Sequence, residues 1–203
     1  MTEDEQSCVA ARTLIDQAHT TEDEEQYDLL TGQAFNLLKP LVAAGVPEAL
    51  YLHACNTLYL EGLDDKAFEE RYIAMIREAA HAGHMRAQFR MGQMHEPEAE
   101  LEADAEASAH WFKLSALQGY PYAQWVHGHN LWTGHGCPCD EALGLDFIRK
   151  AAEGRFEGAI EFVADAYAAG MHGYPKDEAQ AEIWRRRLDE PGVISYCDAV
   201  RIL

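Results

Sequence analysis

The sequence predicts an all-α fold, a right-handed α/α superhelical solenoid of helix-turn-helix repeats. One alanine recurs at intervals of 38, 36 and 36 residues, a period typical of helical repeats. Apolar residues recur at helical spacing between these alanines. We therefore expect about four full repeats plus capping helices. The recurring residues are Ala49, Ala87, Ala123 and Ala159.

Small residues surround each recurring alanine. Five residues after each alanine stands another small residue, which lets a neighbouring helix approach closely; these residues are Ala54, Gly92, Gly128 and Ala164. Four residues before the first three alanines stands a glycine, at Gly45, Gly83 and Gly119. Before the fourth, Arg155 occupies that place and follows Gly154. Glycine at this place predicts a helix that ends in the left-handed conformation.

A second helix is expected in each unit, ending at that turn. The apolar residues at helical spacing fall in residues 34–44, 71–82, 108–118, 142–152 and 179–188. Their aromatic side chains are expected in the core. The turn at residues 136–140 matches the turn at residues 173–177, so Asp140 and Asp177 are predicted to cap helices, with Gln180 completing a capping box with Asp177.

This pattern resembles the Sel-1-like repeat family, a relative of the tetratricopeptide repeats, over about residues 34–196. The resemblance implies a scaffold for protein partners and no catalytic residues. The chain departs from the pattern at residues 96–106, an acidic stretch without the glycine turn, and at Tyr196, which stands where a fifth alanine would. The residues that carry the resemblance most clearly are Ala159, Val163, Ala164, Tyr167, Gly170, Lys176, Asp177, Ala181 and Trp184.

Three segments are predicted. Residues 1–33 form an acidic N-terminal segment with a capping helix, residues 34–192 form the solenoid, and residues 193–203 form a C-terminal capping helix, as the ends of solenoids require.

The charge balance limits the possible partners. With 16 Lys and Arg against 35 Asp and Glu, the net charge is −19, which opposes binding to nucleic acid. Such acidity either keeps the protein soluble or attracts a basic partner. We expect no secretory signal, because residues 1–5 are acidic and no apolar stretch follows them, and we expect no membrane span, because no apolar run is long enough. The five cysteines are then expected to be reduced, in the cytoplasm.

A partner-binding groove is predicted on the first helix of each pair, on the side that helical geometry turns away from the core. The alternative is that curvature buries this row against neighbouring repeats. A groove floor of apolar anchors with a polar edge is typical of recognition surfaces for a helix or an extended peptide. The predicted groove residues are Leu52, Asn56, Tyr59, Arg90, Gln93, Met94, Val126, His129, Asn130, Thr133, Phe162 and Asp165.

The segment from His127 to Cys139 is rich in metal-type ligands. However, His127 and His129 lie two residues apart on a helix and point to different sides. The spacing of Cys137 and Cys139 is shorter than in common zinc sites, so we expect no metal and no other cofactor. No catalytic motif is present, and we expect no enzyme. The acidic stretch at residues 96–106 is either a solvated loop or a docking strip for a basic partner.

The sequence thus favours a protein-binding scaffold or adaptor, with an inhibitor or immunity-type protein for a basic partner as a special case. The alternative is a metal- or redox-responsive sensor that uses the segment from His127 to Cys139.

Overall fold

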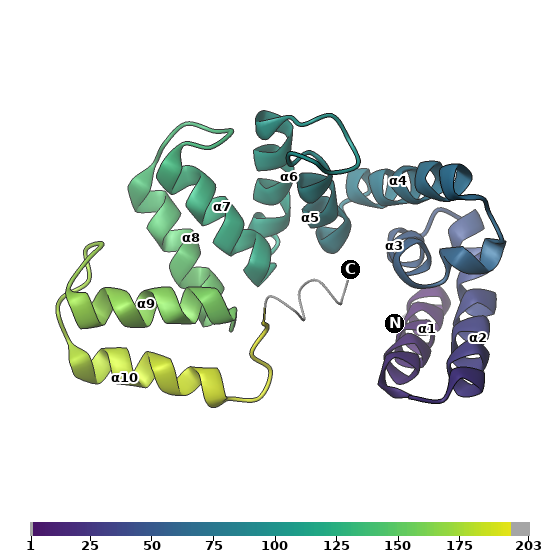
Figure 1. Ribbon diagram of the computed structural model, residues 1–203, viewed down its shortest axis with the longest axis horizontal. Coiled ribbons are helices and arrows are strands. Elements are labelled where there is room, and N and C mark those ends of the chain that lie inside the picture. Colours follow the sequence, from purple (N-terminus) through teal and green to yellow (C-terminus); the bar gives the residue numbers. More distant parts are fainter. Residues whose placement is uncertain (1, 196–203) are drawn as a thin grey trace. The chain divides into compact units, whose positions relative to one another are not determined.

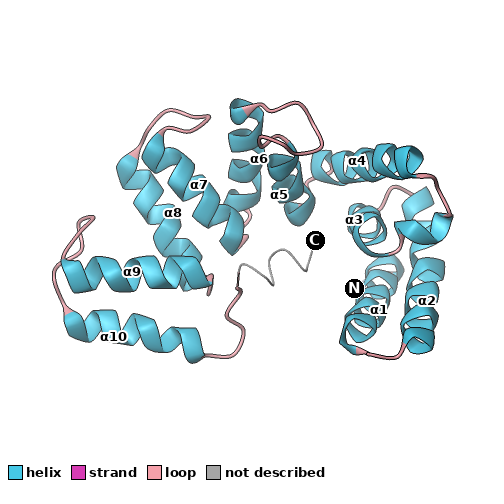
Figure 2. Ribbon diagram, viewed as in Figure 1, coloured by secondary structure: helices cyan, strands magenta, loops and turns pink. Residues whose placement is uncertain are grey.

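The computed structural model describes residues 2–195, and this part of the chain is helical almost throughout (Figure 1). Figure 2 shows helices joined by loops, without a strand in residues 2–195. The all-α prediction is confirmed. The chain divides into two compact units, residues 1–88 and 89–203.

The first unit contains α1 (Glu3–Thr20), α2 (Glu24–Ala43), α3 (Pro47–Asn56), the 3-10 helix η1 (Leu58–Glu61) and α4 (Asp65–His81). Helix α5 (Met85–Met94) contains the boundary between the units. The second unit continues with α6 (Ala105–Leu117), α7 (Pro121–Thr133), α8 (Glu141–Glu153), α9 (Glu157–Ala169), α10 (Glu178–Arg186) and the 3-10 helix η2 (Arg187–Asp189).

Helices α1 and α2 pack against each other, and α3 packs on both. Helix α1 is capped by a capping box between Thr2 and Glu5, and α2 is capped by Asp23, whose carboxylate accepts from the backbone N–H of Glu25. The predicted segment boundary after residue 33 is wrong, because α2 runs through it. Apolar residues spaced along the whole of α2, including Leu30 and Leu38, are buried, so the helix starts ten residues earlier than residue 34, at Glu24.

In the second unit, α7 and α8 cross at close range. A Cβ atom at Gly144 would lie 2.6 Å from the carbonyl oxygen of Gly128, and one at Gly128 would lie 2.8 Å from that of Gly144. The prediction that a small residue at the position of Gly128 permits close helix approach is therefore confirmed. Helix α9 packs on α8 and α10 packs on α9, which continues the pairwise order.

The repeated turns adopt the predicted left-handed backbone. Gly45, Gly83 and Gly119 have φ of 72°, 90° and 92°. At the fourth turn, Arg155 has φ 67°, whereas Gly154 has φ −76°, so the position and not the residue type sets the conformation. The side chains of Asp140 and Asp177 cap α8 and α10 as predicted, and Asp177 accepts from the N–H of Gln180.

The C-terminal capping helix predicted for residues 193–203 lies mostly outside the described residues. Within residues 193–195, Ile194 pairs with the backbone of the fourth turn instead. Its N–H donates to the carbonyl of Arg155 over 2.8 Å, and its carbonyl accepts from the N–H of Glu157 over 3.0 Å.

Candidate functional site

The first helices of the second unit have two different faces. On α7, Ala123, His127 and Leu131 are buried against the core. On the other side of this helix, Trp125 and His129 are only half-buried. The helix therefore leaves aromatic side chains partly exposed on the side where a groove was predicted.

These half-buried rings and their aromatic neighbours lie in direct contact, and we call them the aromatic row. The Trp125 and His129 rings are 4.2 Å apart between centroids, and Trp132 lies 5.7 Å from Phe162 of α9. His172, in the loop after α9, stacks on Phe162 at 5.2 Å and lies edge-on to Trp132 at 4.8 Å. Such offset and edge-on contacts hold rings in fixed positions. The aromatic row consists of Trp125, His129, Trp132, Phe162 and His172.

Unpaired polar atoms occur at the same repeat positions. Gln93 Oε1, His129 Nε2 and Asn130 Nδ2 are buried and find no hydrogen-bond partner among the described residues. Gln93 and His129 occupy the same position in successive repeats, and Asn130 follows His129. An unpaired buried polar group costs about 1–3 kcal/mol, so these atoms are points of local instability in the first helices.

Burial also sets the charge of His129. Desolvation lowers the pKa of its imidazole below the ordinary value, so the ring is neutral at pH 7. A neutral imidazole offers one N–H and one lone pair. The row is thus aromatic and uncharged at its centre, and the exposed carboxylate of Asp165 lies on α9, one turn from Phe162.

The structure places the predicted groove residues unequally. Val126, His129 and Phe162 are half-buried, and Thr133 and Asp165 are exposed, all on α7 and α9. Contacts of His129 with Trp125 and with Phe162 join these two helices on one face.

Two of the predicted anchors are core residues instead. Leu52 is 4% exposed and packs in a cluster with Cys8 and Ala11 of α1. Met94 is fully buried. The alternative, burial by neighbouring helices, is therefore correct at Leu52, because α1 covers the outward side of α3. Asn130 is also buried, and its amide Nδ2 has no hydrogen-bond partner among the described residues.

Three further predicted residues have partners within the chain. Tyr59 lies in η1, because α3 already ends at Asn56, and its hydroxyl donates to Thr31 Oγ1 over 3.0 Å. The amide of Asn56 donates to the carbonyl of Leu52 over 3.0 Å. Arg90 forms an ion pair with Glu100. The side chains of these three residues therefore stabilise the fold, whether or not they also contact a partner.

Sequence reasoning missed Trp125, Trp132 and His172. The signal for the first two was present: Trp125, His129 and Trp132 are spaced by four and three residues, which places them on one face of a helix. His172 gave no such signal, because its place depends on a left-handed backbone with φ 55° in the turn after α9. Among the aromatic residues predicted to be core, Phe112 and Phe147 are indeed buried.

The segment from His127 to Cys139 does not gather ligands in the described structure. As predicted, His127 and His129 point to different sides, one into the core and one into the aromatic row. Within residues 2–195, no three His, Cys, Asp or Glu side chains are grouped so that they could hold a metal ion. Burial raises the pKa of the Cys137 thiol, and the exposed Cys139 thiol donates to the carbonyl of Trp132 over 3.3 Å.

The acidic stretch at residues 96–106 is folded back on the end of α5. Leu101 N–H donates to the carbonyl of Met94 and Asp104 N–H to that of His95, each over 3.0 Å. The carboxylate of Glu96 accepts from the Ser108 hydroxyl, and Asp104 caps α6. These contacts give the stretch a structural role, and docking of a basic partner there remains a prediction.

Helix pairs joined by glycine turns define the class of helical-repeat proteins. Sequence comparison identifies the repeat. The Sel1 repeat profile matches residues 86–120, 121–155 and 159–186, so this part of the chain contains three Sel1 repeats. The resemblance inferred from the alanine spacing is confirmed.

Solved structures agree with this assignment. The chain is similar to a Sel1 repeat protein from Oxalobacter formigenes, with 28% identity, a TM-score of 0.57, and coverage of 63% of this chain and 95% of that one. It also has the fold of a protective antigen of uropathogenic Escherichia coli that displays an SLR fold, with 22% identity and a TM-score of 0.62. That match covers 92% of this chain but 40% of the antigen's length. Sel1 repeat proteins generally act as scaffolds for protein interactions, and their solenoids are typically not enzymes.

No helix among residues 2–195 has both the length and the apolar character needed to cross a membrane.

Proposed function

We propose that this protein is a scaffold or adaptor that binds a basic peptide segment of a protein partner along the aromatic row. One observation carries the proposal: half-buried aromatic rings of α7 and α9 meet on one face of the first helices in the second unit. Aromatic anchors beside hydrogen-bonding groups are the usual composition of an interaction hot spot.

The charge of the chain favours a basic partner. A net charge of −19 attracts Lys-rich and Arg-rich segments, and aromatic faces bind their cationic heads. The chain contains an internal example, since the guanidinium of Arg187 lies 4.0 Å above the ring of Trp184. An inhibitor or immunity-type protein that neutralises a basic partner is the special case of this proposal.

A reducing compartment such as the cytoplasm suits the proposal. Cys8, Cys137 and Cys139 are free thiols. The sensor alternative gains no support from a raised Cys137 pKa, because redox-sensing thiols have lowered pKa values.

The proposal is tested with synthetic 12-residue peptides, some rich in Lys and Arg and others acidic, titrated by fluorescence polarisation. We expect basic peptides to bind and acidic peptides not to bind. Trp132→Ala and Phe162→Ala should each weaken binding about tenfold or more, as truncation of a hot-spot residue does. Raising the salt concentration should weaken it further.

Ile183→Ala is the matched control, because Ile183 is an apolar side chain 49% exposed on α10, outside the row. Circular dichroism verifies that every variant stays helical. Equal affinity of the Trp132→Ala variant and the control would contradict the assignment of the row as the binding surface.

A further inference from the structure

After α10 the chain turns back and reaches the start of α9 with residues 190–195, which we call the C-terminal strap (Figure 1). The strap forms an isolated parallel bridge there, between Phe156 and Ile194. The N–H of Ile194 donates to the carbonyl of Arg155 over 2.8 Å, and the carbonyl of Ile194 accepts from the N–H of Glu157 over 3.0 Å. The start of α9 thus binds an extended segment through main-chain groups, as in the recognition of peptides by strand addition.

Arg155, one of the residues that hold the strap, departs from the repeat. Where the three earlier repeats have a glycine, the fourth has this arginine, with the same left-handed backbone. Its guanidinium donates to the carbonyl of Pro191 and lies 3.5 Å from the carboxylate of Glu190. A glycine at this position could make neither contact, so the clamp on the strap exists only in the fourth repeat.

Glu157 is a second departure that serves the strap. The first and third repeats begin their first helices with Pro47 and Pro121, and proline has no N–H. Glu157 keeps the N–H at this position, where a helix itself provides no acceptor. The carbonyl of Ile194 in the strap is that acceptor.

The strap cannot form a ring contact that joins the repeats to one another. In each of the first three repeats, a ring on the first helix packs on the ring that immediately precedes the first helix of the next repeat. These pairs are Tyr51 with His84, Phe89 with Tyr120, and Trp125 with Phe156, at 4.6, 5.2 and 5.9 Å between ring centroids. In the fourth repeat the position of the first ring holds the exposed Glu161, and the strap offers Val193 in place of the second ring. We therefore expect the strap to leave α9 without unfolding the helix.

The side chains of the strap indicate which chemistry the site accepts. Val193 and Ile194 are half-buried and pack against the apolar cluster of α8 and α9. Pro191 and Gly192 are exposed and form the turn that leads into the strap, where Gly192 has φ 84°. The site thus takes two adjacent β-branched side chains on an extended backbone, and the exposed turn before them provides a hinge.

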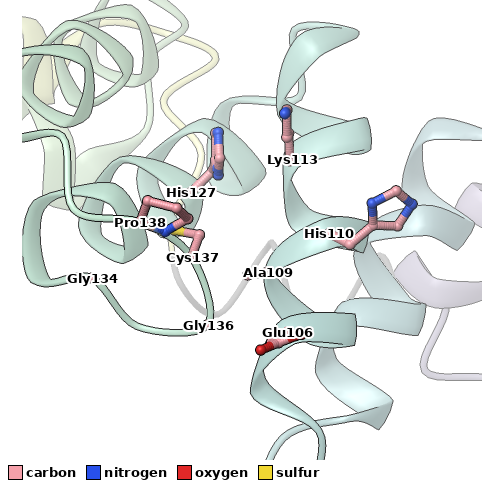
Figure 3. A pocket seen from close by; sticks show the side chains of 9 residues that line it. All are labelled: Glu106, Ala109, His110, Lys113, His127, Gly134, Gly136, Cys137 and Pro138. Atoms are coloured by element: carbon pink, nitrogen blue, oxygen red, sulfur yellow. The ribbon is translucent and has the colours of Figure 1, made fainter.

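The second unit also contains a pocket whose lining selects no class of ligand. This pocket of about 640 Å³ lies between α6 and the turn after α7, and Figure 3 shows His127 on one side of it and Lys113 on the other. Because the acid Glu106 lines it together with Lys113, its charges favour neither an anion nor a cation. At the start of α9, by contrast, a segment of the chain already occupies the site.

We propose that the start of α9 is a binding site for an extended apolar peptide segment, and that the C-terminal strap occupies it as an intramolecular ligand. A partner segment with two adjacent β-branched residues takes the site by displacing the strap. Its main chain pairs with Arg155 and Glu157, and its side chains cover the apolar cluster in place of Val193 and Ile194. The tethered strap competes at a high effective concentration, so it limits binding to partners that fit well. The site requires no basic residue in the partner and does not depend on the proposed function.

The test uses the full chain with a strap that no longer fits. Val193→Asp combined with Ile194→Asp places charges against the apolar cluster and should release the strap from α9. The probe is the peptide Glu-Pro-Gly-Val-Ile-Ser, the sequence of residues 190–195 with blocked ends, titrated by calorimetry. We expect the peptide to bind this double variant in the millimolar range or more tightly. It should bind the wild type about tenfold more weakly or less, because the strap is in place there.

Two changes test the main-chain contacts. Methylation of the isoleucine nitrogen in the peptide removes the N–H that pairs with Arg155, and should weaken binding about fivefold. Glu157→Pro, added to the double variant, removes the N–H that donates to the strap and should have a similar effect. Helix α9 should still form, because proline suits the first residue of a helix. Glu178→Pro, the same change at the first residue of α10, is the matched control and should leave binding unchanged.

Hydrogen exchange in the wild-type chain gives a second readout that needs no variant. The amide of Ile194 should exchange at least about tenfold faster than that of Val163, which is buried within α9, because the strap opens while the helix stays folded. Equal exchange of the two amides would overturn the proposal, since the strap would then open only when the unit unfolds. So would the absence of peptide binding to the double variant at millimolar concentration, or binding that Glu157→Pro does not change. The probe contains no Lys or Arg, so its result is separate from the binding of basic peptides to the aromatic row.

Discussion

Gly128 and Gly144 lie back to back where α7 and α8 cross, each within 3 Å of the other's carbonyl oxygen if a Cβ atom were added. Gly144→Ala should therefore force the helices apart and lower the free energy of unfolding by about 1–3 kcal/mol. Urea denaturation followed by circular dichroism measures the change.

Gly32→Ala provides the matched control for this substitution. Gly32 lies inside α2, and a Cβ atom there would meet nothing within 4 Å. Alanine at a helix interior is more favourable than glycine, so this variant should gain about 0.5–1 kcal/mol. A loss of stability in both variants would show that helix crossing is not the cause in Gly144→Ala.

The repeat could be predicted from the sequence because its determinants are local. A small residue at the helix crossing and a left-handed turn four residues before each alanine are needed in every repeat, so they recur at fixed spacing. The rule holds even at Arg155, which adopts the same left-handed backbone as the glycines at the equivalent positions although it carries a side chain.

The candidate site was only partly predictable, because exposure depends on what covers each repeat. Leu52 and Val126 occupy the same repeat position, but α1 covers Leu52 while Val126 stays half-buried. The helical periodicity of the repeats cannot predict this difference in burial, because α1 lies outside the repeats. Tyr59 was expected on the outward side of α3 by the same helical count, but α3 ends three residues before it, so the count does not apply there.

Glu48 should make the first unit sensitive to acid. Burial alone would raise its pKa, but the hydrogen bond with His84 and the charge of Arg12 outweigh burial and lower the pKa to about 2. Because the unfolded carboxyl titrates near its ordinary value of 4.5, the stabilisation is complete above that pH and is lost as the pH falls towards 2. Glu48→Gln should remove about 1–3 kcal/mol of this dependence.

Urea denaturation at pH 7 and pH 3 measures the effect of Glu48. The wild type should lose more stability between these pH values than Glu48→Gln does. Lys66→Met, a change on the exposed side of α4, should behave like the wild type. An identical pH dependence of wild type and Glu48→Gln would show that the contacts of Glu48 with Arg12 and His84 are worth little in solution.

The thiols should react in the order of their exposure. Cys139 is exposed, whereas Cys8 is buried and burial raises its pKa, which lowers its thiolate fraction. Brief alkylation of the native protein with iodoacetamide, followed by peptide mass spectrometry, should label Cys139 well before Cys8. Alkylation in urea should remove the difference, and faster labelling of Cys8 in the native protein would contradict the packing of α1 on α3.

His127 should destabilise the second unit in mild acid. Burial, and then the charge of Lys113, lower its pKa to about 4, below the ordinary 6.5 of the unfolded chain. Between these values the unfolded state binds a proton that the folded state refuses, so stability falls as the pH drops from 6.5 to 4. The loss between pH 7 and pH 5 should be about 1–2 kcal/mol.

His127→Met places the residue of the second repeat, Met91, at this position and should reduce that loss by about 1–2 kcal/mol while the chain stays folded; the buried His129 accounts for part of the remainder. If wild type and His127→Met lost stability equally over this range, His127 would be solvated in the free protein and its pocket already open to water.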